Sequence, residues 1–150
     1  MSDNSIIRKA NDSDLEDILI LINSPEADNG TAMELRDANA VYQSILDDPN
    51  YFQIVASTEE GIVAIITLAI IMQMTHEGST TGFITDLIIS EAILEKSALV
   101  SDLIQYTTDL AQEYGCYKII INNDYHQDLI ELSSQKLELE KAPPSFNLPA

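Results

Sequence analysis

The middle third of the chain constrains the fold most, because it contains three consecutive strand patterns joined by short turns. Residues 51–57 alternate between the two sides of a strand, and residues 62–72 are β-branched at most positions. The second pattern is typical of a strand covered on both faces. Polar turn residues lie at 58–61 and 76–79, and residues 82–89 form a third strand pattern. The sequence therefore predicts three hairpin-linked strands in the centre of the domain.

A long helix and a further strand follow this central region. Apolar residues recur on one helical face at Leu99, Val100, Leu103, Ile104, Leu110 and Ala111. Gly115 follows as the expected C-cap of this helix. Residues 117–121 have a strand pattern. Because a helix connects this strand to the preceding one, we expect the two strands to be parallel.

The chain before the central strands predicts one short strand and two helices. Residues 5–9 form the strand pattern, and Ser13 followed by Glu16 has the spacing of a capping box at a helix start. Apolar residues of the first helix recur at Leu15, Ile18, Leu19 and Ile22. A second helical pattern covers residues 34–46. Its expected inward positions are Val41, Tyr42 and Ile45.

The end of the chain predicts shorter elements. A helix is expected at 128–135, a strand at 136–140 and a possible last strand at 145–148. The complete order is β-α-α-β-β-β-α-β-α-β-(β), which a mixed sheet with helices on both faces accommodates. We therefore expect a single α/β domain over residues 1–150.

Charge is the most unusual global property of the chain. Seven basic residues face 25 acidic ones, which gives a formal net charge of −18. Such a surface repels nucleic acid and anionic lipid, and it attracts cationic partners. Solubility, or adaptation to a salty cytoplasm, is the simplest explanation of this charge. A specific basic partner, or mimicry of a nucleic acid's charge, is the alternative.

The sequence also predicts a cytoplasmic protein without a disulfide framework or metal. Cys116 is the one cysteine, which excludes an internal disulfide and a cysteine-based zinc cluster. The N-terminus lacks the pattern of a secretory signal, and the apolar run at 62–72 is too short to cross a bilayer. His76 and His126 are the only histidines and lack ligand spacing, so no metal site is expected.

Local sequence in the second half of the chain resembles a known superfamily. Residues 67–71, 75–78 and 83–89 are similar to the third and fourth strands of small bacterial and glucosamine-phosphate acetyltransferases. Residues 115–120 resemble the opening of their fifth strand. With the element order, these segments resemble the GNAT acetyltransferase superfamily. The resemblance implies the GNAT fold, a mixed sheet of the α/β class.

The resemblance also implies where acetyl-CoA would lie. In this superfamily pantetheine lies against the fourth strand, where it splays from the fifth. The pyrophosphate rests on a loop resembling Gln/Arg-x-x-Gly-x-Gly/Ala at the start of the long helix, where glycines and free N–H groups suit an anion. Candidate cofactor residues are therefore Leu87, Ile88, Ile89, Lys96, Ser97, Ala98, Leu99, Val100 and Asn122.

The pyrophosphate motif departs from the superfamily pattern at each of its key positions. Glu95 occupies the Gln/Arg position, Ala98 the first glycine and Val100 the second. A carboxylate thus replaces a phosphate partner, with Glu91 nearby, and a β-branched side chain is expected to fill space that a backbone contact needs. Lys96 is the only cation of the stretch.

The expected catalytic groups are altered as well. Ser134 aligns with the tyrosine that protonates the leaving thiolate in relatives, and a serine hydroxyl is a poor general acid near neutral pH. Thr85 stands where many relatives place a glutamate, and Asp86 follows it. Asp86 is therefore the candidate general base, acting through water. A surface charge or a hydrogen-bonded strand residue is the alternative role.

These departures lead to three hypotheses. The first is a GNAT-fold protein that has lost acetyl-CoA-dependent catalysis and binds a basic partner or its own twin, with no cofactor. The second is an active acetyl-CoA-dependent N-acetyltransferase for a small cationic amine or a peptide N-terminus. The third is an acidic inhibitor that mimics nucleic acid. None of them requires the chain to bind nucleic acid or a membrane.

Overall fold

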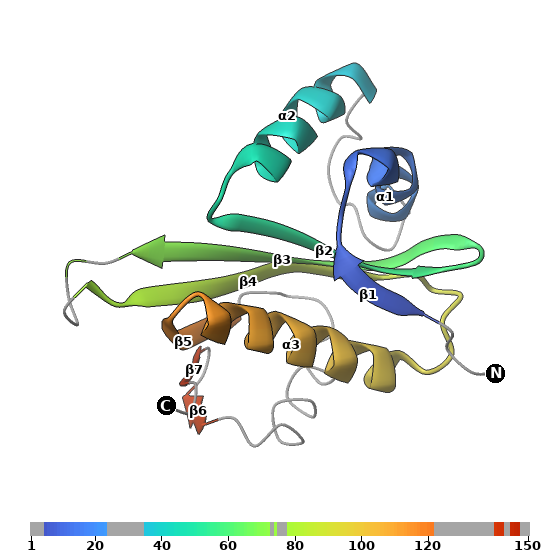
Figure 1. Ribbon diagram of the computed structural model, residues 1–150. Coiled ribbons are helices and arrows are strands. Elements are labelled where there is room, and N and C mark those ends of the chain that lie inside the picture. Colours follow the sequence, from blue (N-terminus) through green and yellow to red (C-terminus); the bar gives the residue numbers. More distant parts are fainter. Residues whose placement is uncertain are drawn as a thin grey trace.

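The computed structural model describes residues 5–23, 35–72, 74, 78–121, 140–142 and 145–147 (Figure 1). Its elements are β1 (Ile6–Lys9), the short 3₁₀ helix η1 (Asp12–Asp14), α1 (Leu15–Ile22), α2 (Leu35–Asp47), β2 (Tyr51–Thr58), β3 (Gly61–Met72), β4 (Thr80–Ile89), α3 (Lys96–Glu113), β5 (Cys116–Ile121), β6 (Glu140–Ala142) and β7 (Ser145–Asn147).

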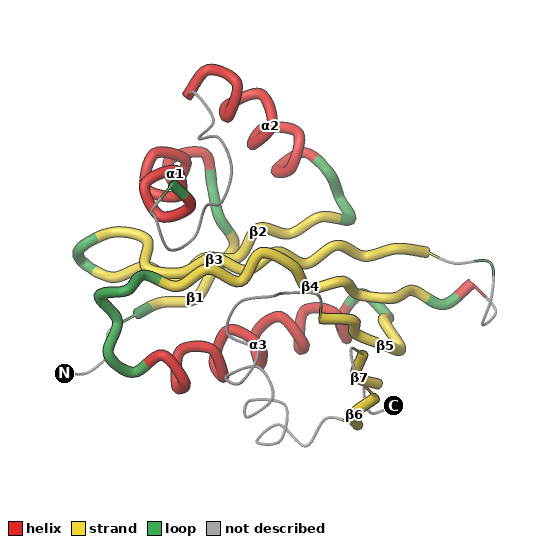
Figure 2. Tube along the Cα trace, turned by 180° about the vertical axis from the view of Figure 1, so that it is seen from behind, coloured by secondary structure: helices red, strands yellow, loops and turns green. Residues whose placement is uncertain are grey.

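The strands form one mixed sheet with helices on both faces. Its order is β1-β2-β3-β4-β5-β7-β6. The pair β4–β5 is parallel, and the other pairs are antiparallel. Helices α1 and α2 lie on one face and α3 on the other, as the views of Figures 1 and 2 both show. The fold class, the central hairpins and the parallel fourth and fifth strands are therefore confirmed.

Strand β3 separates two apolar cores. Ile66 belongs to the core that includes Leu103 and Ile104 of α3. Its neighbour Ile65 belongs to the core under α1 and α2. Because successive side chains of a strand point to opposite faces, a strand covered on both faces needs apolar residues at nearly every position. This explains the unbroken apolar run of β3.

The long helix ends as the sequence predicts. Helix α3 stops at Glu113, and Gly115 has a φ of 80°. Its N–H donates to the carbonyl of Gln112 over 3.0 Å. Glycine adopts this left-handed conformation without steric cost, which makes it the usual residue just after a helix.

Two predictions about the N-terminal helices are wrong. The capping box consists of Asn11 and Asp14, because α1 is preceded by η1 and the cap therefore lies earlier than Ser13. The Asn11 side chain accepts from the N–H of Ser13, and the Asn11 N–H donates to the Asp14 carboxylate over 2.8 Å. On α2, Val41 is exposed, since Ala38 and Tyr42 take the inward positions.

Several predictions fall partly or wholly outside the described residues. The helix at 128–135 lies outside them entirely. Of the strand at 136–140 only Glu140 is described, and β6 continues from there to Ala142. The last strand is confirmed as β7. None of the described helices combines the length and the apolar character needed to span a membrane.

Candidate functional site

A β-bulge interrupts β4 at Asp86. Thr85 pairs with Thr67 and Ile88 pairs with Ile65, so two residues of β4 lie opposite Ile66 alone. Asp86 has a φ of 55°, and it is the one non-glycine residue with positive φ among the described residues. Such bulges bend a strand and re-aim its side chains, and they are frequent beside functional sites.

Strand β4 continues past the end of its pairing with β5. The parallel ladder ends where Ile84 pairs with Ile121, two residues before the bulge. Leu87 and Ile89 point into the core under α3, and Ile88 packs on the core under α1 and α2. The three residues predicted to lie along pantetheine are therefore at the carboxyl end of a parallel strand pair, where open α/β sheets commonly bind ligands.

The Asp86 side chain is exposed at this bulge. Thr85 Oγ1 donates to Asp86 Oδ2 over 3.4 Å. The role of Asp86 as general base stays a prediction. Asn122 and Ser134, which the sequence also places at this site, lie outside the described residues.

The predicted pyrophosphate motif is helical from its second residue. Helix α3 begins at Lys96, and the side chain of its N-cap residue Glu95 makes no capping hydrogen bond. The Leu99 N–H already donates to the Glu95 carbonyl over 3.2 Å. Ala98 is exposed, whereas Leu99 and Val100 are buried. Val100 packs in the core, so it does not place a side chain in the anion space as the sequence suggested.

The one cation of this stretch is already paired. Lys96 Nζ lies 2.9 Å from Glu91 Oε2, and Glu95 is exposed beside it. A helix N-terminus carries a partial positive charge of about half an elementary charge. The ion pair of Glu91 with Lys96 has no net charge. The Glu95 carboxylate therefore adds a negative charge that partly cancels the partial positive charge of the helix N-terminus. The start of α3 is therefore a poorer anion site than a bare helix N-terminus.

A partly buried ion pair joins β1 to η1, just before α1. Arg8 Nη1 lies 2.7 Å from Asp14 Oδ2, and Arg8 Nη2 lies 3.0 Å from Asp14 Oδ1. These hydrogen bonds lower the pKa of Asp14 and raise that of Arg8. The hydroxyl of Tyr42 donates to the Asn11 carbonyl over 2.6 Å and ties α2 to the same turn. Burial, followed by the charge of Asp14, raises the pKa of Tyr42 to about 12.

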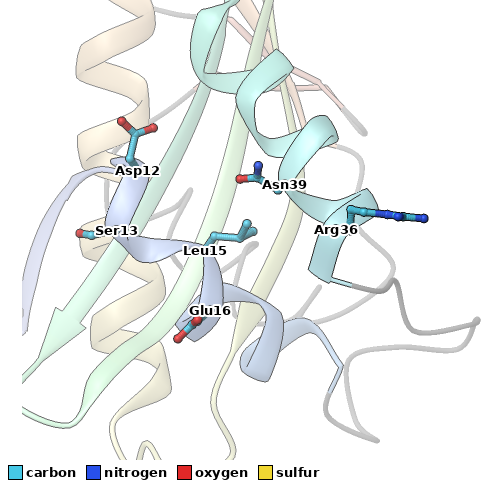
Figure 3. A pocket seen from close by; sticks show the side chains of 6 residues that line it. All are labelled: Asp12, Ser13, Leu15, Glu16, Arg36 and Asn39. Atoms are coloured by element: carbon cyan, nitrogen blue, oxygen red, sulfur yellow. The ribbon is translucent and has the colours of Figure 1, made fainter.

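A surface depression of about 520 Å³ lies between η1–α1 and α2 (Figure 3). Its lining residues are Asp12, Ser13, Leu15, Glu16, Arg36 and Asn39. The side chain of Gln43 donates to Asp12 over 3.0 Å, while Arg36 points away from the other lining residues in Figure 3. Sequence reasoning missed this depression, because it arises only when the two helices pack side by side.

Of the remaining candidate groups the structure describes Cys116, which has the surroundings of a core residue. Cys116 is buried, and burial raises the pKa of its thiol. Thr80 Oγ1 lies 3.6 Å from its sulfur. Among the described residues no three histidine, cysteine or carboxylate side chains gather closely enough to hold a metal ion. His76 and His126 lie outside the described residues.

Comparison with solved structures identifies the fold. A transcriptional regulator from Bacillus halodurans C-125 is 22% identical with a TM-score of 0.75, and the match covers 93% of this chain and 95% of that one. A putative acetyltransferase from Agrobacterium tumefaciens str. C58 is 20% identical with a TM-score of 0.76, covering 97% and 99%. Glucosamine-6-phosphate N-acetyltransferase from Arabidopsis thaliana is 17% identical with a TM-score of 0.77, covering 93% and 94%.

These structures define the class as an α/β protein of acetyltransferase architecture. A GNAT family acetyltransferase from Staphylococcus aureus also matches, over 79% of this chain and 85% of that one, with 19% identity and a TM-score of 0.66. The chain has the GNAT acetyltransferase fold, as the local sequence resemblance predicts. No family model and no curated protein sequence matches the chain.

Proposed function

We propose that this chain is a GNAT-fold protein that has lost acetyl-CoA-dependent catalysis and acts by binding a basic partner. The observation that carries the proposal is the start of α3, where Glu91 holds Lys96 and Glu95 stands at the N-cap. Two unit charges of like sign about 4 Å apart repel by about 1 kcal/mol in water and about 4 kcal/mol near a protein surface. A pyrophosphate at this helix end would meet that repulsion without a free side-chain cation.

The exposed acidic residues on the solvent side of α3 favour the binding of a basic partner. Glu95, Asp102, Asp109 and Glu113 are exposed, and their spacing places them on one line along the helix. We call these four residues the acidic face of α3. Gln105 Nε2 donates to Asp109 Oδ1 over 2.9 Å. The helix sequence contains no Lys or Arg besides Lys96. A lysine- or arginine-rich surface would complement this face and be steered toward it.

Calorimetric titration with acetyl-CoA tests the loss of the cofactor site. We expect no detectable heat with the wild-type protein and a measurable affinity with the Glu91→Gln/Glu95→Gln variant, which frees Lys96 and removes the opposing charge. Because both glutamates are exposed, the substitutions should leave the fold unchanged, which circular dichroism checks. Micromolar binding by the wild type would refute the proposal.

A lysine-rich peptide tests the binding surface. The variant Asp102→Asn/Asp109→Asn/Glu113→Gln removes three charges from the acidic face of α3. Its control, Asp37→Asn/Asp47→Asn/Asp48→Asn, removes three exposed charges from α2 and its C-terminal end. We expect the first variant to weaken binding more than the second, and added salt to weaken both through screening. Equal effects of the two variants would mean that net charge alone attracts the peptide.

An active N-acetyltransferase for a cationic amine is the second candidate, and the bulge at Asp86 favours it. The bulge lies two residues past the last pairing of β4 with β5, where the resemblance places pantetheine. If this function holds, Asp86→Asn should lower the acetylation rate about 10²- to 10⁴-fold. Acetyl transfer to a polyamine, followed by mass spectrometry, measures that rate.

A further inference from the structure

The depression between η1–α1 and α2 carries opposite charges on its two walls (Figure 3). Asp12 of η1 and Glu16 of α1 line one wall, and Arg36 of α2 lines the other. None of the described lining residues belongs to the candidate site at β4 and the start of α3. The depression is therefore a separate candidate binding site, with an acidic wall on η1–α1 and a basic wall on α2.

The charged groups of both walls are free to bind a ligand. In the part of the chain that the structure describes, neither Arg36 nor Glu16 forms an ion pair, although the chain has 25 acidic residues and seven basic ones. Gln43 Nε2 donates to Asp12 Oδ1 over 3.0 Å, and the second oxygen of this carboxylate can accept a further hydrogen bond. Both walls therefore keep charge-assisted hydrogen-bonding capacity for a third group.

An apolar side chain and an amide lie between the two charged walls. Leu15 of α1 and Asn39 of α2 point toward each other in Figure 3. Leu15 is only 9% exposed, so it offers a fixed apolar contact. The Asn39 amide can donate to a carboxylate or accept from an ammonium group. The volume of about 520 Å³ lies within the range of about 300–1,000 Å³ that is usual for small-molecule pockets.

The two walls together select a ligand that carries both charges. An anion would be repelled by Asp12 and Glu16 and by the net charge of −18. A cation would leave Arg36 without a partner, and it would find carboxylates over the whole surface. We propose that the depression binds a free aliphatic amino acid. Its ammonium group binds Asp12 and Glu16, its carboxylate binds Arg36, and its side chain packs on Leu15.

This binding requires the Arg36 side chain to turn toward the ligand. In Figure 3 the side chain points away from the other lining residues. Because it is exposed, it can change rotamer within nanoseconds. Ordering it costs side-chain entropy, and exposed charge pairs contribute little in water. We therefore expect a dissociation constant in the millimolar range.

A ligand that binds both walls also joins η1–α1 to α2. The side chains of Tyr42 and Gln43 make hydrogen bonds from α2 to the turn at Asn11 and Asp12. A bridging ligand adds to these contacts in the folded state alone, so the midpoint of thermal unfolding should rise with ligand concentration. A ligand with a single charge should raise it less.

Chemical-shift titration of the isotope-labelled full chain with three matched ligands tests the proposal. L-Norvaline carries both charges, butylamine is the same molecule without the carboxylate, and pentanoate is the same molecule without the ammonium group. We expect norvaline to bind about threefold to fivefold more tightly than either, as one exposed charge pair provides. The shifts should lie at residues 12–16 and 36–43. Butylamine binding as tight as that of norvaline, or no saturable shift with norvaline at millimolar concentration, overturns the proposal.

Two variants test the walls separately. Arg36→Gln should reduce the affinity for norvaline to that for butylamine, and Glu16→Gln should weaken the binding of norvaline and butylamine but not that of pentanoate. Asp47→Asn, exposed at the other end of α2, is the matched control and should have little effect. All three side chains are exposed, so the fold should persist, which circular dichroism checks. A preference for norvaline over butylamine that survives Arg36→Gln would show that the carboxylate binds elsewhere, and the proposal would be wrong.

Discussion

The replacement Asp14→Asn should cost the protein about 2 kcal/mol of unfolding free energy at neutral pH. The Asp14 carboxylate accepts both hydrogen bonds of the Arg8 fork and a third from the Asn11 N–H. An asparagine keeps one acceptor oxygen and turns an N–H₂ group toward these donors. Breaking a fully buried pair costs about 3–5 kcal/mol. The Arg8 side chain is 34% exposed and that of Asp14 7%, so the arginine can rehydrate and the cost falls below that range.

The pH dependence of this loss follows from the lowered pKa of Asp14. Hydrogen bonding to Arg8 is the first cause of the shift. A carboxyl group with a lowered pKa in the folded state contributes its stability above the unfolded pKa of about 3.9. This contribution disappears as the pH falls through the still lower folded pKa. The difference between wild type and Asp14→Asn should therefore be constant at neutral pH and shrink below about pH 4.

Urea unfolding followed by circular dichroism, at neutral pH and at two acidic values, measures this difference. With a net charge of −18, removing any carboxylate also relieves repulsion. Glu16→Gln is the matched control, because it removes one charge from an exposed position two residues further along, in the first turn of α1. A loss for Asp14→Asn no larger than that of Glu16→Gln would refute the reasoning. A difference that persists unchanged at the lowest pH would refute the assigned role of the charge.

Two further changes test other parts of the structure by thermal unfolding. Thr108→Val should leave stability unchanged or raise it by up to about 1 kcal/mol, because the buried Thr108 Oγ1 has no hydrogen-bond partner among the described residues. A clear loss would mean that the hydroxyl is bonded. Asp86→Val should be less stable than Asp86→Gly by about 1–2 kcal/mol, because a β-branched residue is strained at a φ of 55°. Equal stabilities would mean that β4 lacks the bulge in solution.

The parts of the fold that the sequence predicted are those with long, regular patterns. The β-branched run of β3 and the helical spacing of α3 each depend on burial of whole faces, so single exceptions do not hide them. Predictions of local detail were wrong where two sequence patterns competed for the same position. Ser13 and Glu16 have capping-box spacing, but the pair Asn11 and Asp14 is preferred because Asp14 also binds Arg8 of β1. That contact joins separate elements and is invisible in a local pattern.

The sequence predicted the location of the candidate site but not its geometry. The resemblance of the sequence to the GNAT superfamily predicted a site at Asp86 and the start of α3. The left-handed conformation of Asp86 could not be predicted, because it depends on how β3 pairs on both sides of Ile66. The pair of Glu91 with Lys96 joins residues on both sides of the helix start, so spacing alone gave only their proximity.

The residues of the altered pyrophosphate motif form two groups, one buried and one exposed, with different effects on stability. Leu99 and Val100 are buried in the core and contribute packing, whereas Glu95 and Ala98 are exposed and contribute little to it. Substitutions at exposed positions usually change stability by less than about 0.5 kcal/mol. The exposed half can therefore lose its fit to a phosphate without any loss of fold. Retention of the GNAT fold thus carries no information about acetyl-CoA, and the charges at Glu91, Glu95 and Lys96 decide that question.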